Sequence, residues 1–400
     1  MKEVKVALVG TGFAANIHGE AYSHVPGYNV KIVSVASKRQ DEAKAFCKKY
    51  GIDENNIYEN ADEMINTVDC DIVDLVVPTF LHVPFAIKAA EAGKNVICEK
   101  PLTGYFGDPN IPIDERENVG NTDRKVMLEE CIKDCERLEK AFEKTDAKFC
   151  YAENWCYAPP ITKAKSIIEK SGGKILEIRT GESHSGSHSK FAAQWKYTGG
   201  GSLIRMGAHP FGAALHLKMW EGMVRNGDPI YPESVISECA QYRPMLNKLD
   251  DEKDRIVSRP VDVEDWSTSI IRFSDGTNAT VIGSDVTLGG IENWLNVYAS
   301  NTRIECKISN NNSVMAYAPT EKEFKDVYTI EKTETKTGWT QAQPDEDWMT
   351  GYPFEALDFV GCVAEDREPV SNMDLAIWCA KTMYAAYVSA EQDKRVKIPE

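Results

Sequence analysis

The residues that could do chemistry begin with a glycine-rich run at positions 10–15, Gly-Thr-Gly-Phe-Ala-Ala. In a GxGxxA motif the first glycine permits a tight turn, the second lets the backbone approach a pyrophosphate, and the alanine keeps helix and strand close. The N-terminus of the following helix then favours the phosphate charge. An apolar strand precedes the run and a helix follows it, so the sequence predicts a dinucleotide site formed by Gly10, Thr11, Gly12, Phe13, Ala14 and Ala15.

The second chemical signal follows the strand expected at Lys31–Ala36, where the chain reads Ser37, Lys38 and Arg39. An acidic residue at this place binds the 2′-hydroxyl of NAD, whereas hydroxyl and basic groups suit the 2′-phosphate of NADP. The first acidic residue is Asp41, so the sequence mildly favours NADP over NAD. In the alternative interpretation Lys38 and Arg39 are solvated, and Arg39 stacks on the adenine of either cofactor.

The third signal is Cys98-Glu99-Lys100-Pro101, at the carboxyl end of the strand expected at Asn95–Glu99. Ligands of open parallel sheets bind at that end of the strands. A lysine there can donate to a substrate oxygen beside the nicotinamide, and the proline could fix the turn through a cis bond. Lys100 is therefore a candidate catalytic residue.

The elements that must position these residues alternate along the first part of the chain, which predicts βαβ units and a parallel sheet. After Ala152, alternating apolar residues and the hairpin signal Asp275-Gly276 favour antiparallel strands. We expect an α/β protein with an N-terminal Rossmann domain over residues 1–155 and a C-terminal α+β domain over residues 156–400, whose large open sheet is mainly antiparallel. The expected strands are Val4–Val9, Lys31–Ala36, Ile72–Val77, Asn95–Glu99, Lys148–Ala152, Ile175–Thr180, Ser269–Phe273, Asn278–Gly283 and Trp294–Ala299; the expected helices are Ala14–Tyr22, Asp41–Tyr50, Val83–Ala92, Lys125–Lys144, Ile161–Lys170, Phe354–Val363 and Asp374–Gln392.

One polar segment, 103–123, interrupts the alternation and carries no clear period. A loop of this length inside a domain is usually functional or a surface insertion. A surface or oligomer-contact insertion is the favoured interpretation. A cover over the active site stays open, because the segment begins directly after Pro101.

Composition limits the partners of the chain. The formal net charge is -16 over 400 residues, which argues against nucleic acid and anionic membranes. The eleven cysteines form no CxxC pair, and free buried thiols suit a reducing cytoplasm. We expect no signal peptide, because a strand is predicted at the first residues, and no membrane span, because no apolar run is long enough.

Taken together, these motifs resemble the Gfo/Idh/MocA oxidoreductases. The resemblance rests on GTGFAA, VPTFLH at 77–82, GKNVICEKPL, the stretch 154–159, the glycine run at 199–203, Gly207-Ala208-His209, Val263-Glu264-Asp265 and the closing helix, so it spans nearly the whole chain. It implies NAD(P)-dependent oxidation or reduction of a hydroxyl on a sugar, sugar acid, cyclitol or glycoside. It also implies homodimers or homotetramers formed through the open sheet.

The resemblance assigns roles to individual residues. Lys100 matches the lysine that contacts the reacting hydroxyl, and His209 matches a histidine that acts as general acid/base or proton relay. A histidine near neutral pKa can take the hydroxyl proton during hydride transfer. The implied cofactor neighbours are Pro78, Thr79, His82, Glu99 and Lys100, and Asn154 is an implied substrate contact.

Two positions depart from the family pattern, in which aspartates often stand where this chain has Arg205 and Gly212. We therefore expect no carboxylate partner for His209. Arg205 either binds an anionic group of the substrate or, in the favoured interpretation, is salt-bridged away from the site. Trp155 and Tyr157 could stack on a sugar ring or belong to the core.

A loop with two histidines, His184 and His188, follows Glu182. Both histidines are expected to face the substrate. A metal site with Glu182 and His209 is a weaker alternative, and a plain polar loop is another, so we predict no metal ligand.

Three functions remain in view. The favoured one is the dehydrogenase or reductase. The second is a redox-neutral lyase or glycosidase that uses bound NAD through a keto-sugar intermediate, with His184 or His188 as the second base. The third is a non-catalytic sugar or dinucleotide sensor. The sequence leaves open which sugar and which carbon react, in which direction, and the size of the oligomer.

Overall fold

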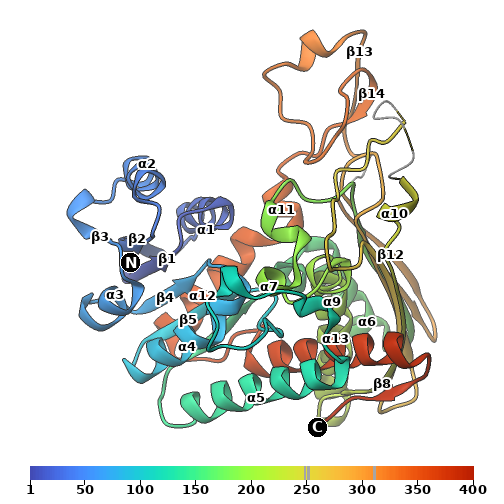
Figure 1. Ribbon diagram of the computed structural model, residues 1–400, viewed down its shortest axis with the longest axis horizontal. Helices are drawn as coiled ribbons and strands as arrows, with labels where there is room; N and C mark the ends of the chain where they lie inside the picture. The colour runs from blue at the N-terminus through green and yellow to red at the C-terminus, as the bar shows by residue number, and fades with distance from the viewer. Residues whose placement is uncertain (247–248, 250–252, 310–311) are drawn as a thin grey trace.

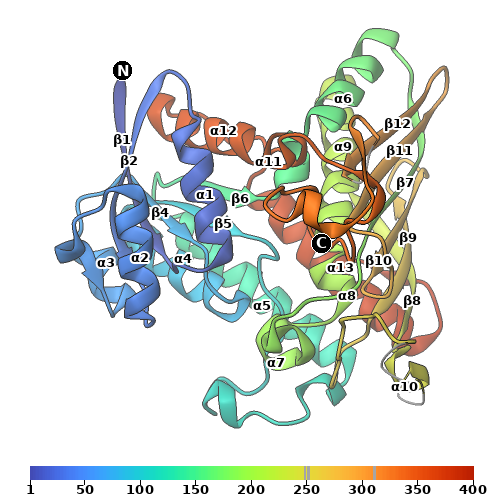
Figure 2. The same ribbon diagram turned by 90° about the horizontal axis from the view of Figure 1, so that it is seen from above.

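The computed structural model describes residues 1–246, 249, 253–309 and 312–400. Two sheets lie on opposite sides of a central group of helices (Figures 1 and 2). The chain leaves the first sheet at Ala152 and enters the second at Ile175. A domain boundary at 155/156 remains a proposal within that interval.

The first sheet is parallel throughout, with the order β3-β2-β1-β4-β5-β6. The order reverses between β1 and β4, which makes the carboxyl ends of these strands the place where a ligand binds. The prediction of a Rossmann sheet is therefore confirmed. Its strands are β1 (Lys2–Val9), β2 (Tyr28–Ala36), β3 (Ile57–Tyr58), β4 (Ile72–Leu75), β5 (Asn95–Glu99) and β6 (Phe149–Ala152).

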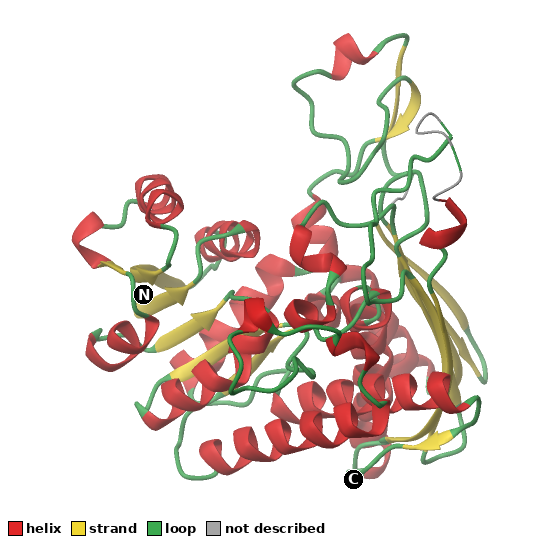
Figure 3. Cartoon of the chain, in the orientation of Figure 1, coloured by secondary structure: helices red, strands yellow, loops and turns green. Residues whose placement is uncertain are grey.

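Helices cover both faces of this sheet (Figure 3). They are α1 (Phe13–Ser23), α2 (Gln40–Tyr50), α3 (Ala61–Thr67), α4 (His82–Glu91) and α5 (Arg124–Phe142). The long helix α5 buries Leu128, Cys131, Cys135 and Leu138, which lie three or four residues apart and therefore on one face. That face packs against α4 and α13 (Met373–Gln392), so the last long helix of the chain is joined to the first sheet.

The second sheet is mixed, with the order β12-β11-β7-β10-β9-β8-β15. Most of its pairs are antiparallel, as expected, but β7 runs parallel to β10 and antiparallel to β11. The expectation that Ile175–Thr180 has antiparallel neighbours is thus only half right, because a long connection leads from β7 to β10 and no hairpin fixes their direction. The strands are β7 (Ile175–Ser183), β8 (Pro232–Ala240), β9 (Trp266–Phe273), β10 (Asn278–Ser284), β11 (Glu292–Ala299), β12 (Arg303–Ser309) and β15 (Val396–Lys397).

Three long helices line the inner face of the second sheet and leave its outer face open (Figure 2). They are α6 (Pro159–Ser171), α9 (Ala208–Asn226) and α13. Helix α12 (Tyr352–Glu365) returns to pack on α1 of the first sheet. The remaining helices are short: α7 (Trp195–Thr198), α8 (Ser202–Arg205), α10 (Arg243–Leu246) and α11 (Glu346–Thr350).

A two-stranded arm, β13 (Met315–Ala318) and β14 (Gly338–Gln341), projects beyond both sheets (Figure 1). The segment 103–123 instead lies against the body of the protein. Asp114 accepts hydrogen bonds from Lys196 and Tyr197 through its backbone and side-chain oxygens, and Gly120 N donates to Asp262 Oδ2 at 3.0 Å. The segment therefore packs beside α7, which immediately precedes the glycine run.

All eleven cysteines are free thiols, and ten of them are buried. Across the described residues, no helix is both long and apolar enough to cross a lipid bilayer.

Candidate functional site

The glycine-rich turn between β1 and α1 has the geometry that a dinucleotide requires. Gly10 has φ +101°, and a Cβ at this position would lie 2.3 Å from Val76 O. Ala15 is fully buried where α1 meets the sheet. Gly12 precedes the first turn of α1, whose free N–H groups point out of the helix end. The turn therefore fits a pyrophosphate.

A groove of about 470 Å³ runs from this turn to α2, and Thr11, Phe13, Arg39 and Lys49 line it. Thr11 Oγ1 donates to Ser37 Oγ at 3.1 Å, which places Ser37 at the groove. Arg39 lies over Gly12 and pairs at 2.7 Å with Glu42, which also lines the groove; the side chains of Arg39 and Lys38 are both exposed. The groove is thus rich in hydroxyl and basic groups near the end of β2.

The Lys100–Pro101 peptide is cis, and His82 lies behind it. The two ring nitrogens of His82 each lie 2.8 Å from a carbonyl oxygen, one of Pro101 and one of Val77. Burial lowers the pKa of His82. His82 therefore links the turn at Lys100 and Pro101 to the turn at Pro78 and Thr79, which follows β4.

Beneath Lys100 lies a buried charged chain that the sequence reasoning missed. His18 donates to Asp74 Oδ2 at 2.9 Å and to Glu99 Oε1 at 3.1 Å, and Glu99 Oε2 accepts from Lys100 N at 3.0 Å. Burial acts against the charge on His18, but Asp74 and Glu99 outweigh it and raise the pKa of His18 well above its ordinary value. The available signal was the place of His18, one turn after the glycine motif.

Lys100 reaches from the first sheet to the second half of the chain. Its Nζ donates to Arg205 O at 3.4 Å, at the end of α8. Glu264 holds the glycine run before α8, because its two carboxylate oxygens accept from Gly201 N at 3.1 Å and Leu203 N at 2.8 Å. The bond from Lys100 to Arg205 therefore places Lys100 near the start of α9, the helix that carries His209.

His209 is buried and has two carboxylates around it. Its Nδ1 lies 2.8 Å from Glu153 Oε1, and its Nε2 lies 4.0 Å from Glu182 Oε2. Trp155 stacks on the imidazole with ring centroids 5.6 Å apart. Burial raises the pKa of Glu182, and His209 and Lys100 offset that effect only in part. The site therefore has a histidine, a lysine and a carboxyl group with a raised pKa close to one another.

The expectation that His209 lacks a carboxylate partner is wrong. Glu153 takes that place from the end of β6, and it is fully buried. The sequence around position 212 could not show this partner, because Glu153 lies 56 positions earlier in the chain than His209.

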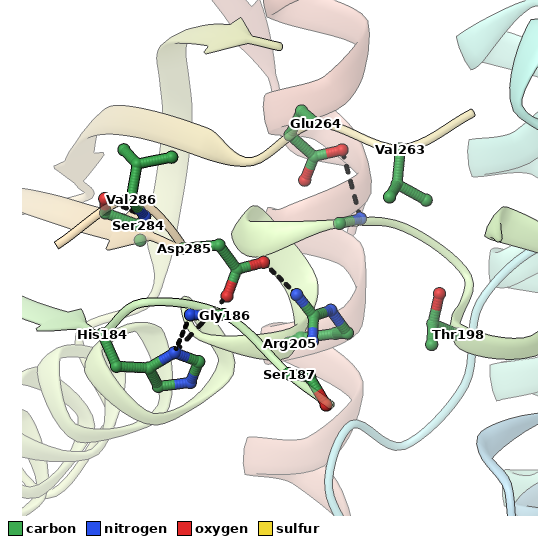
Figure 4. Close-up of polar contacts among 12 residues, drawn as sticks. His184, Gly186, Ser187, Thr198, Arg205, Val263, Glu264, Ser284, Asp285 and Val286 are labelled. Atoms are coloured by element: carbon green, nitrogen blue, oxygen red, sulfur yellow. Dashed lines mark hydrogen bonds and ion pairs between the residues drawn. The ribbon is translucent and has the colours of Figure 1, made fainter. Parts of the chain in front are cut away.

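Arg205 is paired with Asp285, which is 1% exposed, so the favoured interpretation of a salt-bridged arginine agrees with the geometry. Figure 4 shows Arg205 and His184 on either side of Asp285. His184 Nδ1 accepts from Gly186 N at 2.8 Å, so its Nε2 carries the proton. Burial, with Lys332, Arg205 and Lys100, lowers the pKa of His184 to about 2.

Lys332 belongs to this part of the site, although sequence reasoning missed it. It lies at the base of the arm, has φ +58°, and donates from Nζ to Gly186 O at 2.8 Å. Burial lowers the pKa of Lys332, and Glu331 and Asp285 offset that effect only in part. The sequence carries no local motif at this position.

Three residues that were expected to contact the substrate differ in their surroundings. Tyr157 donates to Asp358 Oδ2 at 2.8 Å and accepts from Ser371 N, so its hydroxyl is directed toward α12. His188 is exposed, in contrast to buried His184. Asn154 is buried, and its Nδ2 donates to Thr350 O at 2.8 Å. The substrate contacts proposed for Tyr157 and His188 therefore receive no support from the geometry.

Among the described residues, no group of three or more His, Cys, Asp or Glu side chains could hold a metal ion. The metal alternative for the His184–His188 loop thus lacks a ligand set.

The first sheet, its glycine turn and the lysine at the end of β5 define a dinucleotide-binding oxidoreductase fold. Two family models match the chain. The model of an oxidoreductase family with an NAD-binding Rossmann fold covers residues 4–110, and that of the Gfo/Idh/MocA C-terminal domain covers residues 161–305. The chain belongs to the Gfo/Idh/MocA family.

Individual proteins show the same likeness. An uncharacterized protein of Saccharomyces cerevisiae is 31% identical over 173 residues, which span 43% of this chain and 42% of that protein. Levoglucosan dehydrogenase of Pseudarthrobacter phenanthrenivorans is 25% identical over 326 residues, or 77% of this chain and 72% of the enzyme. The crystal structure of GenD2 from gentamicin A biosynthesis, in complex with NAD, superposes with a TM-score of 0.78 at 21% identity, covering 100% of this chain and 97% of that one.

Proposed function

We propose that this protein is an NAD(P)-dependent dehydrogenase or reductase that acts on a hydroxyl group of a sugar, cyclitol or glycoside. The observation that carries the proposal is the contact of Lys100 Nζ with Arg205 O, which brings the lysine of the first sheet beside the helix of His209. The family membership and the likeness to levoglucosan dehydrogenase support the substrate class.

The residues of the chain would share the work as follows. The nicotinamide, when bound, supplies the acceptor or donor of the hydride. Lys100 donates a hydrogen bond to the reacting oxygen and stabilises negative charge on it. His209 donates from Nδ1 to Glu153, so its Nε2 is free to take the hydroxyl proton. Glu182 lies on that same side and accepts or donates a hydrogen bond to a substrate hydroxyl.

We favour an uncharged substrate. Arg205, the residue that could bind an anionic group, is held by Asp285. Glu182 and Asp285 are both buried, so little water reaches these polar groups, and burial raises the pKa of each. Such a site suits hydroxyl groups that both donate and accept.

NADP is the cofactor that the end of β2 favours. Ser37, Arg39 and Lys49 lie at one groove, and no acidic side chain stands at positions 37–40. Hydroxyl and basic groups suit a 2′-phosphate, whereas NAD is usually bound through an acidic residue at this place. The alternative, in which Arg39 stacks on adenine, predicts equal affinity for both.

The test is a spectrophotometric screen of the whole protein against neutral sugars, glycosides, cyclitols and uronic acids, with NAD and NADP in parallel. We expect cofactor reduction with a neutral compound class, and a loss of about 10³-fold in kcat for Lys100→Met. Lys125→Met, an exposed lysine on α5, is the matched control and should keep wild-type rates. Dinucleotide binding without turnover of any compound would instead support a sensor.

The redox-neutral mechanism has less support, because the second base that it needs is not evident. His184 carries its proton on Nε2 and has a pKa of about 2, and His188 is exposed. This mechanism predicts product formation with no net change in reduced nicotinamide, and product analysis in the same screen would detect it.

We also propose a homodimer or homotetramer formed by the open face of the second sheet. Ile236 and Ile270 form a cross-strand pair there and are 38% and 41% exposed. Analytical ultracentrifugation of Ile270→Glu against wild type tests this interface. The eleven free cysteines support a reducing compartment, and we propose the cytoplasm.

A further inference from the structure

Glu153 follows β6 and His209 lies on α9, so their contact requires room between these two elements. Glu153 follows β6, is 0% exposed, and also accepts from Trp155 N at 3.3 Å. His209 lies in the first turn of α9, with its ring stacked on Trp155. For Glu153 Oε1 to come within 2.8 Å of Nδ1, the glutamate side chain must pass along the surface of α9.

Gly212 lies one turn after His209, at the place where the glutamate crosses the helix. A Cβ at position 212 would lie 2.6 Å from Glu153 Cγ, 2.9 Å from Cδ and 3.1 Å from Oε2. Contacts under about 3 Å force something to move, and here the crowded atoms belong to a fully buried side chain. Any larger residue at position 212 would therefore displace the carboxylate.

The backbone gives no other reason for a glycine at this position. Gly212 lies inside a 19-residue helix and is absent from the residues with positive φ. Glycine in a helix interior costs about 1 kcal/mol relative to alanine. The space that it leaves for Glu153 is the feature that offsets this cost.

We propose that Gly212 forms a notch in α9 that admits the Glu153 carboxylate, and that Glu153 is the positioning residue that sets the tautomer of His209. The inference rests on the proposed function for its catalytic consequence. Glu153 holds the proton on Nδ1, which leaves the Nε2 lone pair toward Glu182 and the substrate. The wrong tautomer would present a proton where a base is needed.

The first test compares Gly212→Ala with Gly361→Ala, a helical glycine in α12 whose added Cβ would meet only side-chain atoms of Arg367 and Tyr28. We expect Gly212→Ala to lower kcat by about 10- to 100-fold, with KM and the dinucleotide Kd within about threefold. Gly361→Ala should keep wild-type kcat. Wild-type kcat in Gly212→Ala would overturn the proposal.

A carboxylate exchange gives the sharper result. Glu153→Ala and Gly212→Asp should each lower kcat, the second because the new side chain collides with Glu153. The double variant Glu153→Ala/Gly212→Asp moves the carboxylate onto α9, three residues from His209, and should recover kcat at least about tenfold over Glu153→Ala. Additive losses in the double variant would show that the two positions are independent, and would overturn the proposal.

The third readout needs no turnover and so separates this inference from the proposed function. In ¹⁵N-histidine spectra, with the His209 signal assigned by His209→Asn, the wild-type ring should be protonated on Nδ1. Glu153→Leu, which removes the acceptor at a similar side-chain size, and Gly212→Ala should both shift the ring toward the Nε2–H tautomer. If both variants keep the wild-type tautomer, Glu153 does not position His209, whether or not any sugar is turned over.

Discussion

His18 Nε2 donates to Glu99 Oε1 at 3.1 Å, and this bond joins the helix of the glycine motif to the strand end that carries Lys100. The other ring nitrogen is bound to Asp74, so the imidazolium is shared between two carboxylates. The part of the site that would hold the cofactor and the part that would hold the substrate are therefore linked by one buried charge.

We predict that His18→Gln destabilises the protein by about 3 kcal/mol near pH 6, since it leaves buried carboxylates without their cation. The pKa of His18 is raised, so its contribution is complete below its unfolded value of about 6.5 and declines as pH rises toward the folded value. The pKa of Glu99 is lowered, so its carboxylate contributes to stability at both pH 6 and pH 9. Urea unfolding near pH 6 and pH 9 should show the smaller penalty at pH 9.

His24→Gln is the matched control for that experiment. His24 is 43% exposed and lies 3.5 Å from Glu20 on the same helix. It should cost less than about 1 kcal/mol at either pH. An equal penalty for His18→Gln at the two pH values would contradict a charged His18.

The cofactor prediction concerns Arg39 at the groove beside Gly12. Arg39→Ala should raise the Kd for NADP about 10- to 100-fold and change the Kd for NAD by less than about threefold, because a charge-assisted bond to the 2′-phosphate is lost. Isothermal titration with both cofactors measures this difference. Arg137→Ala, which removes an exposed arginine from α5, should leave both values unchanged.

Ser37→Asp should raise the Kd for NADP and lower the Kd for NAD in the same titration. A carboxylate at the end of β2 repels the 2′-phosphate and can bind the 2′-hydroxyl of NAD. Equal losses for NAD and NADP in Arg39→Ala would favour adenine stacking instead.

Asp262 attaches the 103–123 segment to the chain before the glycine run. Its Oδ2 accepts from Gly120 N at 3.0 Å and its Oδ1 from Trp195 N at 2.7 Å. Asp262→Ala leaves both donors unpaired, at a cost of about 1–3 kcal/mol each where they are buried. We expect faster cleavage by trypsin within the segment, at Arg116, in limited proteolysis.

Asp108→Ala, a change at an exposed aspartate of the same segment, is the control and should keep the wild-type cleavage rate. A segment that is cleaved equally in both variants is not held by Asp262.

Asp285 supplies the counter-charge of Arg205. Asp285→Asn keeps the shape but leaves the arginine without its counter-charge beside Lys332, and we expect a loss of about 3 kcal/mol in urea unfolding. The double variant Arg205→Met/Asp285→Asn removes both charges and should recover at least half of that loss. If the double variant is no more stable than Asp285→Asn, the unpaired charge of Arg205 is not the cause of the loss.

The parallel sheet, the glycine turn and the position of Lys100 at a strand end could be predicted from the sequence, because they depend on local periodicity and on residues next to one another in the chain. Gly10 is an example, since its positive φ belongs to a turn within a motif of six residues. The hairpin at Gly276, with φ +85°, follows from the same kind of local chemistry.

The tertiary structure alone decided which groups surround His209, His18 and Arg205. Glu153, Asp74, Asp285 and Lys332 are separated from these partners by tens of residues or more, and no spacing rule connects a strand end with a distant helix. The parallel pairing of β7 with β10 was decided in the same way. Long-range packing sets these contacts, since a carboxylate can reach a buried imidazole or guanidinium from any element that the fold brings beside it and that leaves room for its atoms.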